Sequence, residues 1–183
     1  MASRSIKSLI PEMEKKARLV QEYCKTNGVS LLIYCTVRPL EEQAVLFRKS
    51  HDWKFIENKI NKLESRGFGF LADIIKDVGP QKQIKSVTNA APGESFHAYG
   101  EAFDAVPLLS GKPMWKYSDY KSGWDTYAKA LKECDLTWGG NFQQKFKDLP
   151  HAQLCPGSNP LKLYPPEVIK AILTENGLLN GDY

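Results

Sequence analysis

Two short stretches of the chain combine histidine with a carboxylate in a way that could bind a metal ion. The first is SFHAYGEAFDAVP, in which Asp104 follows His97 by seven residues, and the second is DLPH, in which His151 follows Asp148 by three. Hydrolytic zinc sites commonly hold the ion with three His, Asp or Glu side chains and leave a fourth position to water. His97, Asp104 and His151 would form such a set, with Asp148 beside it as a general base.

Each pair also has a simpler interpretation, a loop histidine hydrogen-bonded to a surface carboxylate. Asp104 lies between Phe103 and Ala105 in an apolar run. Either that strand is half exposed and Asp104 faces water, or the carboxylate is buried. An unpaired buried carboxylate would be costly, and a bound cation would remove that cost. The third histidine, His51, follows no such pattern and is expected to be a solvated surface residue.

Turn residues flank these candidates. Gly100 would let the chain turn between His97 and the strand of Asp104. Gly139-Gly140 follows a short apolar run, and Pro150 restricts the backbone just before His151. The candidate side chains therefore lie next to turns, where a scaffold can position them.

The apolar spacing predicts the elements that carry these turns. Helices are expected at 8–26, 40–49, 122–134 and 165–177, and strands at 29–37, 101–107, 136–138 and 151–155, with a short one at 86–88. Residues 50–80 predict two further helices, separated at Gly67 and Gly69, that form a helical insertion. Because the elements do not alternate regularly between strand and helix, we expect an α+β fold with a small, mostly antiparallel central sheet flanked by helices.

The composition fits one globular domain spanning 1–183. The 183 residues carry a net charge of +4, and the lysines are spread without a basic run, which argues against nucleic-acid binding. No apolar run approaches the ~20 residues of a membrane span. The four cysteines form no CxxC pair and are expected to be reduced thiols. The first residues contain no apolar stretch typical of a signal peptide.

Four stretches resemble the D-Ala-D-Ala metallopeptidase family, zinc peptidases that share a fold with hedgehog signalling domains. SFHAYGEAFDAVP resembles the signature SxHxxGxAxD, and TWGGNFQQKFKDLPHAQL resembles the WGG…DxPH segment. Upstream, CTVRPLEEQAVLF and SVTNAAPGESFH are similar to the family's R-(S/T)-x-x-E-Q and VTNAxxGxSxH stretches. The resemblance covers residues 29–48 and 84–155, and is greatest to the phage endolysins that cleave the L-alanyl-D-glutamate bond.

The resemblance implies roles for seven residues. His97, Asp104 and His151 would bind one Zn²⁺ per chain, Asp148 would be the general base, and Arg38 would steady the oxyanion. Two further positions, Ser95 and Gln43, match residues expected to contact substrate or support the site.

Two features depart from the family pattern. Ala152 stands where the family usually has an aromatic residue, and residues 50–80 are longer than the endolysin pattern. Both departures concern substrate subsites rather than the metal ligands.

The implied function is a zinc-dependent peptidoglycan hydrolase, most like an L-alanyl-D-glutamate endopeptidase. The alternatives are a D-Ala-D-Ala carboxypeptidase or dipeptidase on the same site, and a non-catalytic zinc-binding module, against which the presence of Asp148 and Arg38 argues. Bacterial peptidoglycan would be the partner, and the protein would act as a monomer without membrane insertion or a separate wall-binding module. An endolysin would be made in the host cytoplasm without a signal peptide and would reach the periplasm after the membrane opens.

Overall fold

The computed structural model describes residues 1–84, 88–143, 147–157 and 159–179. The chain divides into two compact units. Unit 1 comprises Met1, Arg38–Tyr99 and Asn159–Tyr183, and unit 2 comprises Ala2–Val37 and Gly100–Ser158. The expected strand at 86–88 falls mostly outside the described residues.

Unit 2 contains the sheet. Its strands are β1 (Ser30–Cys35), β2 (Ala102–Leu109), β3 (Lys112–Pro113), β4 (Thr137–Trp138) and β5 (His151–Gln153). They run in the order β1-β2-β5-β4, with β3 paired to β2, and every pairing is antiparallel. The predicted small antiparallel sheet is therefore confirmed, although β1 and β5 are shorter than the sequence suggested.

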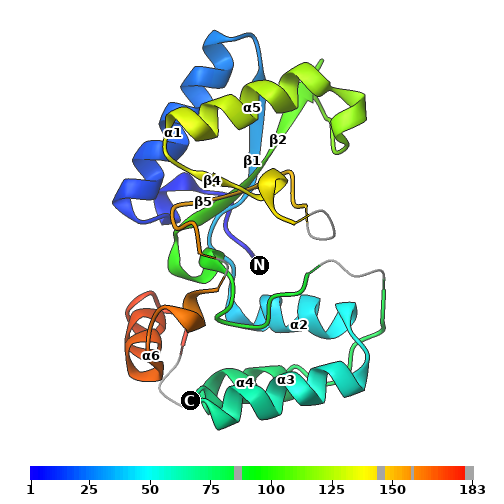
Figure 1. Ribbon diagram of the computed structural model, residues 1–183, viewed down its shortest axis with the longest axis vertical. Helices are drawn as coiled ribbons and strands as arrows, with labels where there is room; N and C mark the ends of the chain where they lie inside the picture. The colour runs from blue at the N-terminus through cyan, green and yellow to red at the C-terminus, as the bar shows by residue number, and fades with distance from the viewer. Residues whose placement is uncertain (85–87, 144–146, 158, 180–183) are drawn as a thin grey trace. The chain divides into compact units, whose positions relative to one another are not determined.

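Two helices of unit 2, α1 (Pro11–Thr26) and α5 (Lys121–Glu133), lie side by side and pack against the sheet (Figure 1). Each buries residues at helical spacing because one face of an amphipathic helix must leave water. Those residues are Met13, Ala17, Val20 and Cys24 in α1, and Trp124, Tyr127, Ala130 and Leu131 in α5. They form one apolar core with Phe103 and Ala105 of β2 and Ala152 of β5.

Among its described residues, unit 2 also has three short 3₁₀ helices: η1 (Ile6–Ser8), η3 (Tyr117–Asp119) and η4 (Gly139–Asn141). The turn predicted at Gly100 is present, with a φ of +68° that favours glycine. A Cβ at this position would lie 3.1 Å from the backbone nitrogen of Ile10. The turn that leads into β2 therefore requires glycine for both conformation and space.

Unit 1 is helical. It contains α2 (Leu40–Ser50), α3 (Trp53–Ser65), α4 (Gly69–Asp77) and α6 (Pro166–Glu175), with the short helices η2 (Phe96–Tyr99) and η6 (Pro160–Lys162). A second apolar core joins these elements through side chains such as Phe47, Leu63, Leu71, Ile169 and Leu173. The two helices expected in residues 50–80 are confirmed as α3 and α4, and Gly67 between them adopts a φ of +82°. That the 183 residues form a single domain stays a prediction.

Candidate metal centre

A row of paired residues crosses three strands of unit 2. Asp104 of β2 pairs with Cys35 of β1 on one side and with His151 of β5 on the other. Directly paired residues in an antiparallel sheet point to the same face. Phe103 and Ala105 flank Asp104 and are buried in the core under α1 and α5, so alternation turns Asp104, Cys35 and His151 to the opposite face.

Asp104 lies close to the side chains that flank it in this row. The Nδ1 atom of His151 is 3.2 Å from the Oδ1 atom of Asp104, and the two residues are only 8% and 6% exposed. The Sγ atom of Cys35 lies within 4.8 Å of a carboxylate oxygen of Asp104. Asp104 is thus buried rather than half exposed, which decides between the two interpretations left open by the sequence.

The donor set fits a metal ion. Imidazole nitrogen, carboxylate oxygen and thiolate sulfur are the protein ligands that zinc-type ions take. Asp104 and His151 are brought together as the sequence predicted. Cys35, which the sequence predicted to be a plain reduced thiol, lies beside Asp104, with which it pairs after a shift in register between Ile33 and Cys35.

Hydrogen bonds to its backbone hold the turn that carries Asp148 and His151. The backbone N–H of His151 donates to the carbonyl of Asp148 at 3.2 Å, and the indole N–H of Trp138 donates to the carbonyl of Leu149 at 2.7 Å. The Asp148 N–H in turn donates to the carbonyl of Gly139 at 3.1 Å. These three hydrogen bonds hold the backbone on which the general-base candidate Asp148 lies.

Pro150, the next residue of that turn, accepts two hydrogen bonds. The hydroxyl of Tyr127 donates to its carbonyl at 2.8 Å, and the N–H of Ala105 donates at 3.0 Å. Burial, followed by the charge of Asp104, raises the pKa of Tyr127 well above its usual value of 10.0. The phenol therefore remains a protonated donor throughout the physiological range and ties the turn to α5.

Gly139 occupies a position that no other residue fits. A Cβ there would lie 2.9 Å from the Cβ of His151 and closer still to the carbonyl oxygen of Asp148. The glycine that follows β4 therefore allows the turn of Asp148 to pack directly on η4.

Arg38 and Gln43 lie together in unit 1. The guanidinium Nη1 of Arg38 donates to Oε1 of Gln43 at 2.8 Å, and Nε2 of Gln43 donates to Thr88 Oγ1 at 3.2 Å and to the carbonyl of Ala90 at 2.7 Å. Gln43 is only 3% exposed, so its amide orients Arg38. The backbone N–H of Arg38 meets the carbonyl of His97 at 3.4 Å. Sequence-distant residues 38, 43 and 97 are thus neighbours within this unit.

The loop before His97 is braced by a buried carboxylate. Both oxygens of Glu94 accept from the ammonium of Lys59, at 3.0 and 2.8 Å, and Glu94 also accepts from the Asn159 amide and the Ala91 N–H. Ser95 follows directly, half-buried, and His97 lies in η2 with 2% exposure. The loop that presents Ser95 and His97 is therefore held by charge-assisted hydrogen bonds, which are stronger than neutral ones.

His51 is not the solvated surface residue that was expected, and that prediction is wrong. Its half-buried ring stacks on Phe55 with centroids 4.1 Å apart, and Nε2 lies 3.0 Å from the Thr88 carbonyl. Burial lowers its pKa. The side chain packs where α2 meets α3 and stabilises the fold of unit 1.

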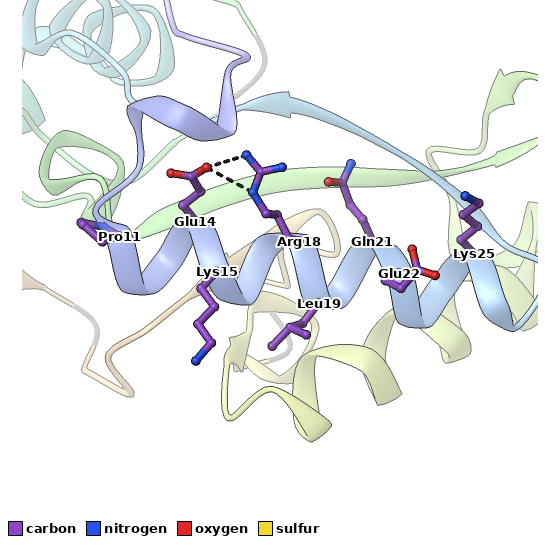
Figure 2. A pocket seen from close by; sticks show the side chains of 8 residues that line it. All are labelled: Pro11, Glu14, Lys15, Arg18, Leu19, Gln21, Glu22 and Lys25. Atoms are coloured by element: carbon purple, nitrogen blue, oxygen red, sulfur yellow. Dashed lines mark hydrogen bonds and ion pairs between the residues drawn. The ribbon is translucent and has the colours of Figure 1, made fainter.

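The outer face of α1 carries a shallow depression lined by charged side chains. Figure 2 shows that the side chains of Lys15 and Leu19 point away from those of Glu14 and Arg18, which form an ion pair at 2.6 Å. Acidic and basic groups alternate here and none of the predicted site residues is present. The depression is an ordinary solvated helix face.

This arrangement defines an α+β protein with a candidate metal site on its sheet, and comparison with known proteins shows what the chain is similar to. Residues 88–154 match the family model described as D-alanyl-D-alanine carboxypeptidase. The predicted resemblance to the D-Ala-D-Ala metallopeptidases is therefore confirmed over the segment that holds His97, Asp104, Asp148 and His151.

The proteins similar to the chain include two endopeptidases. The peptidoglycan L-alanyl-D-glutamate endopeptidase CwlK of Bacillus subtilis is 34% identical over 84 residues, which are 43% of this chain and 50% of CwlK. The chain thus spans about half the length of this curated relative. The L-Ala D-Glu endopeptidase ChiX of Serratia marcescens aligns with a TM-score of 0.45 and 19% identity over 90% of this chain and 92% of ChiX.

Proposed function

We propose that the protein is a zinc-dependent peptidoglycan endopeptidase that hydrolyses the L-alanyl-D-glutamate bond of stem peptides. The observation that carries the proposal is the buried pair of Asp104 and His151, whose Oδ1 and Nδ1 atoms lie 3.2 Å apart. The match to a peptidase family over residues 88–154 and the similarity to CwlK support the substrate class.

His97, Asp104 and His151 are the ligands we propose for one zinc ion. Imidazole and carboxylate donors suit zinc, and three protein ligands leave a coordination position open in hydrolytic sites. His97 lies seven residues before Asp104, with the Gly100 turn in between, and is buried like the other two. Zinc bound there would supply the Lewis acidity that activates water and polarises a carbonyl at neutral pH.

Asp148 would be the general base. It would take a proton from the attacking water and pass it to the leaving amine of D-glutamate. Water adds to the L-alanyl carbonyl, the C–N bond breaks, and the products are an L-alanyl carboxylate and a free D-glutamyl amine. The backbone bonds around Asp148 support this role because a base must be held in position.

Arg38 would hold the negative charge that develops on the carbonyl oxygen. One such group typically contributes about 3 kcal/mol to transition-state stabilisation. Its hydrogen bond to the buried Gln43 amide supports the assignment, since an oriented guanidinium needs no reorganisation during the reaction. Ser95 and Gln43 would complete the substrate side of the site.

A second candidate, a D-Ala-D-Ala carboxypeptidase or dipeptidase, is favoured by the description of the matching family model. Both activities use the same kind of metal site and differ in the peptide bond presented. A non-catalytic zinc module is disfavoured by the presence of both Asp148 and Arg38.

The setting we propose is that of a phage endolysin. The protein would accumulate in the host cytoplasm and act as a monomer on the wall in the periplasm once the membrane has been opened. Among the described residues, no helix combines the length and apolar character needed to cross a lipid bilayer.

Digestion of purified murein followed by mass spectrometry tests the activity. We expect stem peptides with a new N-terminal D-glutamate, formed with added zinc and lost with a chelator. Release of D-alanine instead would favour the carboxypeptidase or dipeptidase. No soluble product under either condition would refute the proposed function.

A further inference from the structure

Gln153 is a buried amide that contacts one of the proposed ligands. It lies two residues after His151 on β5 and is 3% exposed. Its Nε2 donates to the backbone carbonyls of Cys155 and of Gly157, the latter at 2.7 Å. Its Oε1 lies 2.8 Å from Nε2 of His151.

These contacts determine the orientation of the Gln153 side-chain amide. Carbonyl oxygens can only accept hydrogen bonds, so the end of Gln153 that faces Cys155 and Gly157 must be its NH₂ group. The end that faces His151 is therefore the oxygen, which is only an acceptor. It follows that Nε2 of His151 carries the hydrogen.

The other ring nitrogen is fixed as a consequence. In a neutral imidazole one nitrogen is a donor and the other bears a lone pair, so Nδ1 of His151 directs its lone pair toward Oδ1 of Asp104, 3.2 Å away. In the neutral ring these two acceptor atoms face each other, and a metal ion bound to both would remove their repulsion.

We propose that Gln153 is a positioning residue that selects the Nδ1-ligating form of His151. The inference rests on the proposed metal site and deepens it by naming the group that prepares the ligand. By bonding the carbonyls of Cys155 and Gly157, Gln153 also anchors the ligand's orientation to the loop after β5. Partners of this kind around metal ligands typically contribute 10- to 100-fold to metal affinity.

The protonation form of His151 can be read directly in metal-free protein. Nitrogen–proton correlation spectra of the three histidine rings, recorded with a chelator at about pH 8.5, where histidines are ordinarily neutral, should show His151 as the Nε2–H tautomer. Substitution of each histidine in turn assigns the signals. An Nδ1–H tautomer for His151 in the wild-type protein would overturn the proposal.

Variants then connect the tautomer to metal binding. Gln153→Met keeps the side-chain length but has no comparable acceptor, so we expect His151 to populate both tautomers and the zinc Kd to rise about 10- to 100-fold. Gln153→Glu keeps an acceptor toward Nε2–H and should retain the tautomer. Gln21→Met, on the outer face of α1, is the matched control and should match the wild type (Figure 2).

Zinc affinity is measured by competition with a chromophoric chelator, and circular dichroism checks that each variant is folded. A Gln153→Met protein that keeps the wild-type tautomer and affinity would contradict the proposal. If Gln153→Met does not fold, the tautomer of the wild-type protein decides it. Because the tautomer is read without metal or substrate, failure of this inference is distinguishable from failure of murein digestion.

Discussion

Asp104 illustrates how a carboxylate can be held inside an apolar strand. Its neighbours Phe103 and Ala105 point into the core beneath α1 and α5, whereas its own side chain faces His151. A buried carboxylate must be paired or bound to a cation, since an isolated charge is costly in a medium of low polarity. The same packing that buries Asp104 therefore keeps its oxygens at a defined distance from the histidine.

The first prediction concerns Asp148. Asp148→Ala removes the proposed base but no proposed metal ligand, so zinc content should stay near one per chain while murein hydrolysis falls about 10²- to 10⁴-fold. Metal content is measured by atomic emission and hydrolysis by a murein turbidity assay. The control, Asp119→Ala at an exposed position, should hydrolyse murein normally. Normal hydrolysis by Asp148→Ala would remove this residue from the mechanism.

The second prediction is a pH dependence of stability. Burial, with a contribution from Cys134, raises the pKa of the Cys24 thiol from 9.0 to about 12. Between these values the unfolded chain loses the thiol proton and the folded protein keeps it. The folded state then binds more protons, so this contribution to stability is full below pH 9.0 and is lost as the pH rises, by about 1.4 kcal/mol per pH unit.

Urea unfolding at about pH 8 and about pH 10.5 measures this slope, since the first value lies below the window and the second lies halfway through it. Cys24→Ala should lose less stability between the two pH values than the wild type does. Cys155→Ala, in the loop after β5, should lose as much as the wild type. Equal losses in all three proteins would show that Cys24 does not control the dependence.

At the scale of elements, the close packing of η4 on the turn before β5 gives a third prediction. Gly139→Ala introduces a Cβ 2.9 Å from that of His151, and relief of the overlap must move the turn that carries Asp148. We expect a stability loss of about 1–3 kcal/mol together with a larger loss of hydrolysis. Gly69→Ala is the control, because its Cβ would meet no atom within 4 Å.

Chemical denaturation and the murein assay should therefore separate the two glycine variants. Gly69→Ala, in a helix, should be at least as stable as the wild type because alanine favours helix. Wild-type stability and activity in Gly139→Ala would mean that η4 does not hold the turn in place.

The elements were largely readable from the sequence, since helices and strands follow from apolar periodicity. Helix α1, predicted at 8–26, begins at Pro11 because the residues before it form the separate turn η1. The pairing of the strands could not be predicted from the sequence. The partnership of Cys35 with Asp104 depends on a register shift in β1, and no local pattern encodes it.

The position of Gln153 in the chain carries part of the information about its role. It lies two residues after His151 in a predicted strand, and alternation alone would have turned both side chains to the same face. Its role could still not be inferred, because the contacts to the carbonyls of Cys155 and Gly157 depend on how the following loop folds back.

For the whole molecule, the predicted site residues are divided by the order of the chain. Unit 2 is interrupted after Val37 and resumes at Gly100, and the intervening segment belongs to unit 1. Asp104, Asp148 and His151 therefore belong to unit 2, whereas His97 belongs to unit 1. Binding of zinc by His97 must therefore be tested in the intact chain. The zinc-dependent change in the thermal unfolding temperature provides this test.

Zinc that binds only the folded protein stabilises it by about 2.7 kcal/mol at a concentration 100 times the Kd, which corresponds to a rise in Tm of about 5–10 °C for a chain of this size. We expect that rise, relative to chelated protein, in the wild type and in His51→Gln, because the stacking of His51 on Phe55 affects both states alike. His97→Ala should lose most of it, since a site with two ligands left binds the ion far more weakly. The comparison uses the zinc-dependent difference in Tm, so any general loss of stability in a variant cancels. An undiminished rise in His97→Ala would exclude His97 as a ligand and would leave Cys35, already beside Asp104, as the candidate for the third donor.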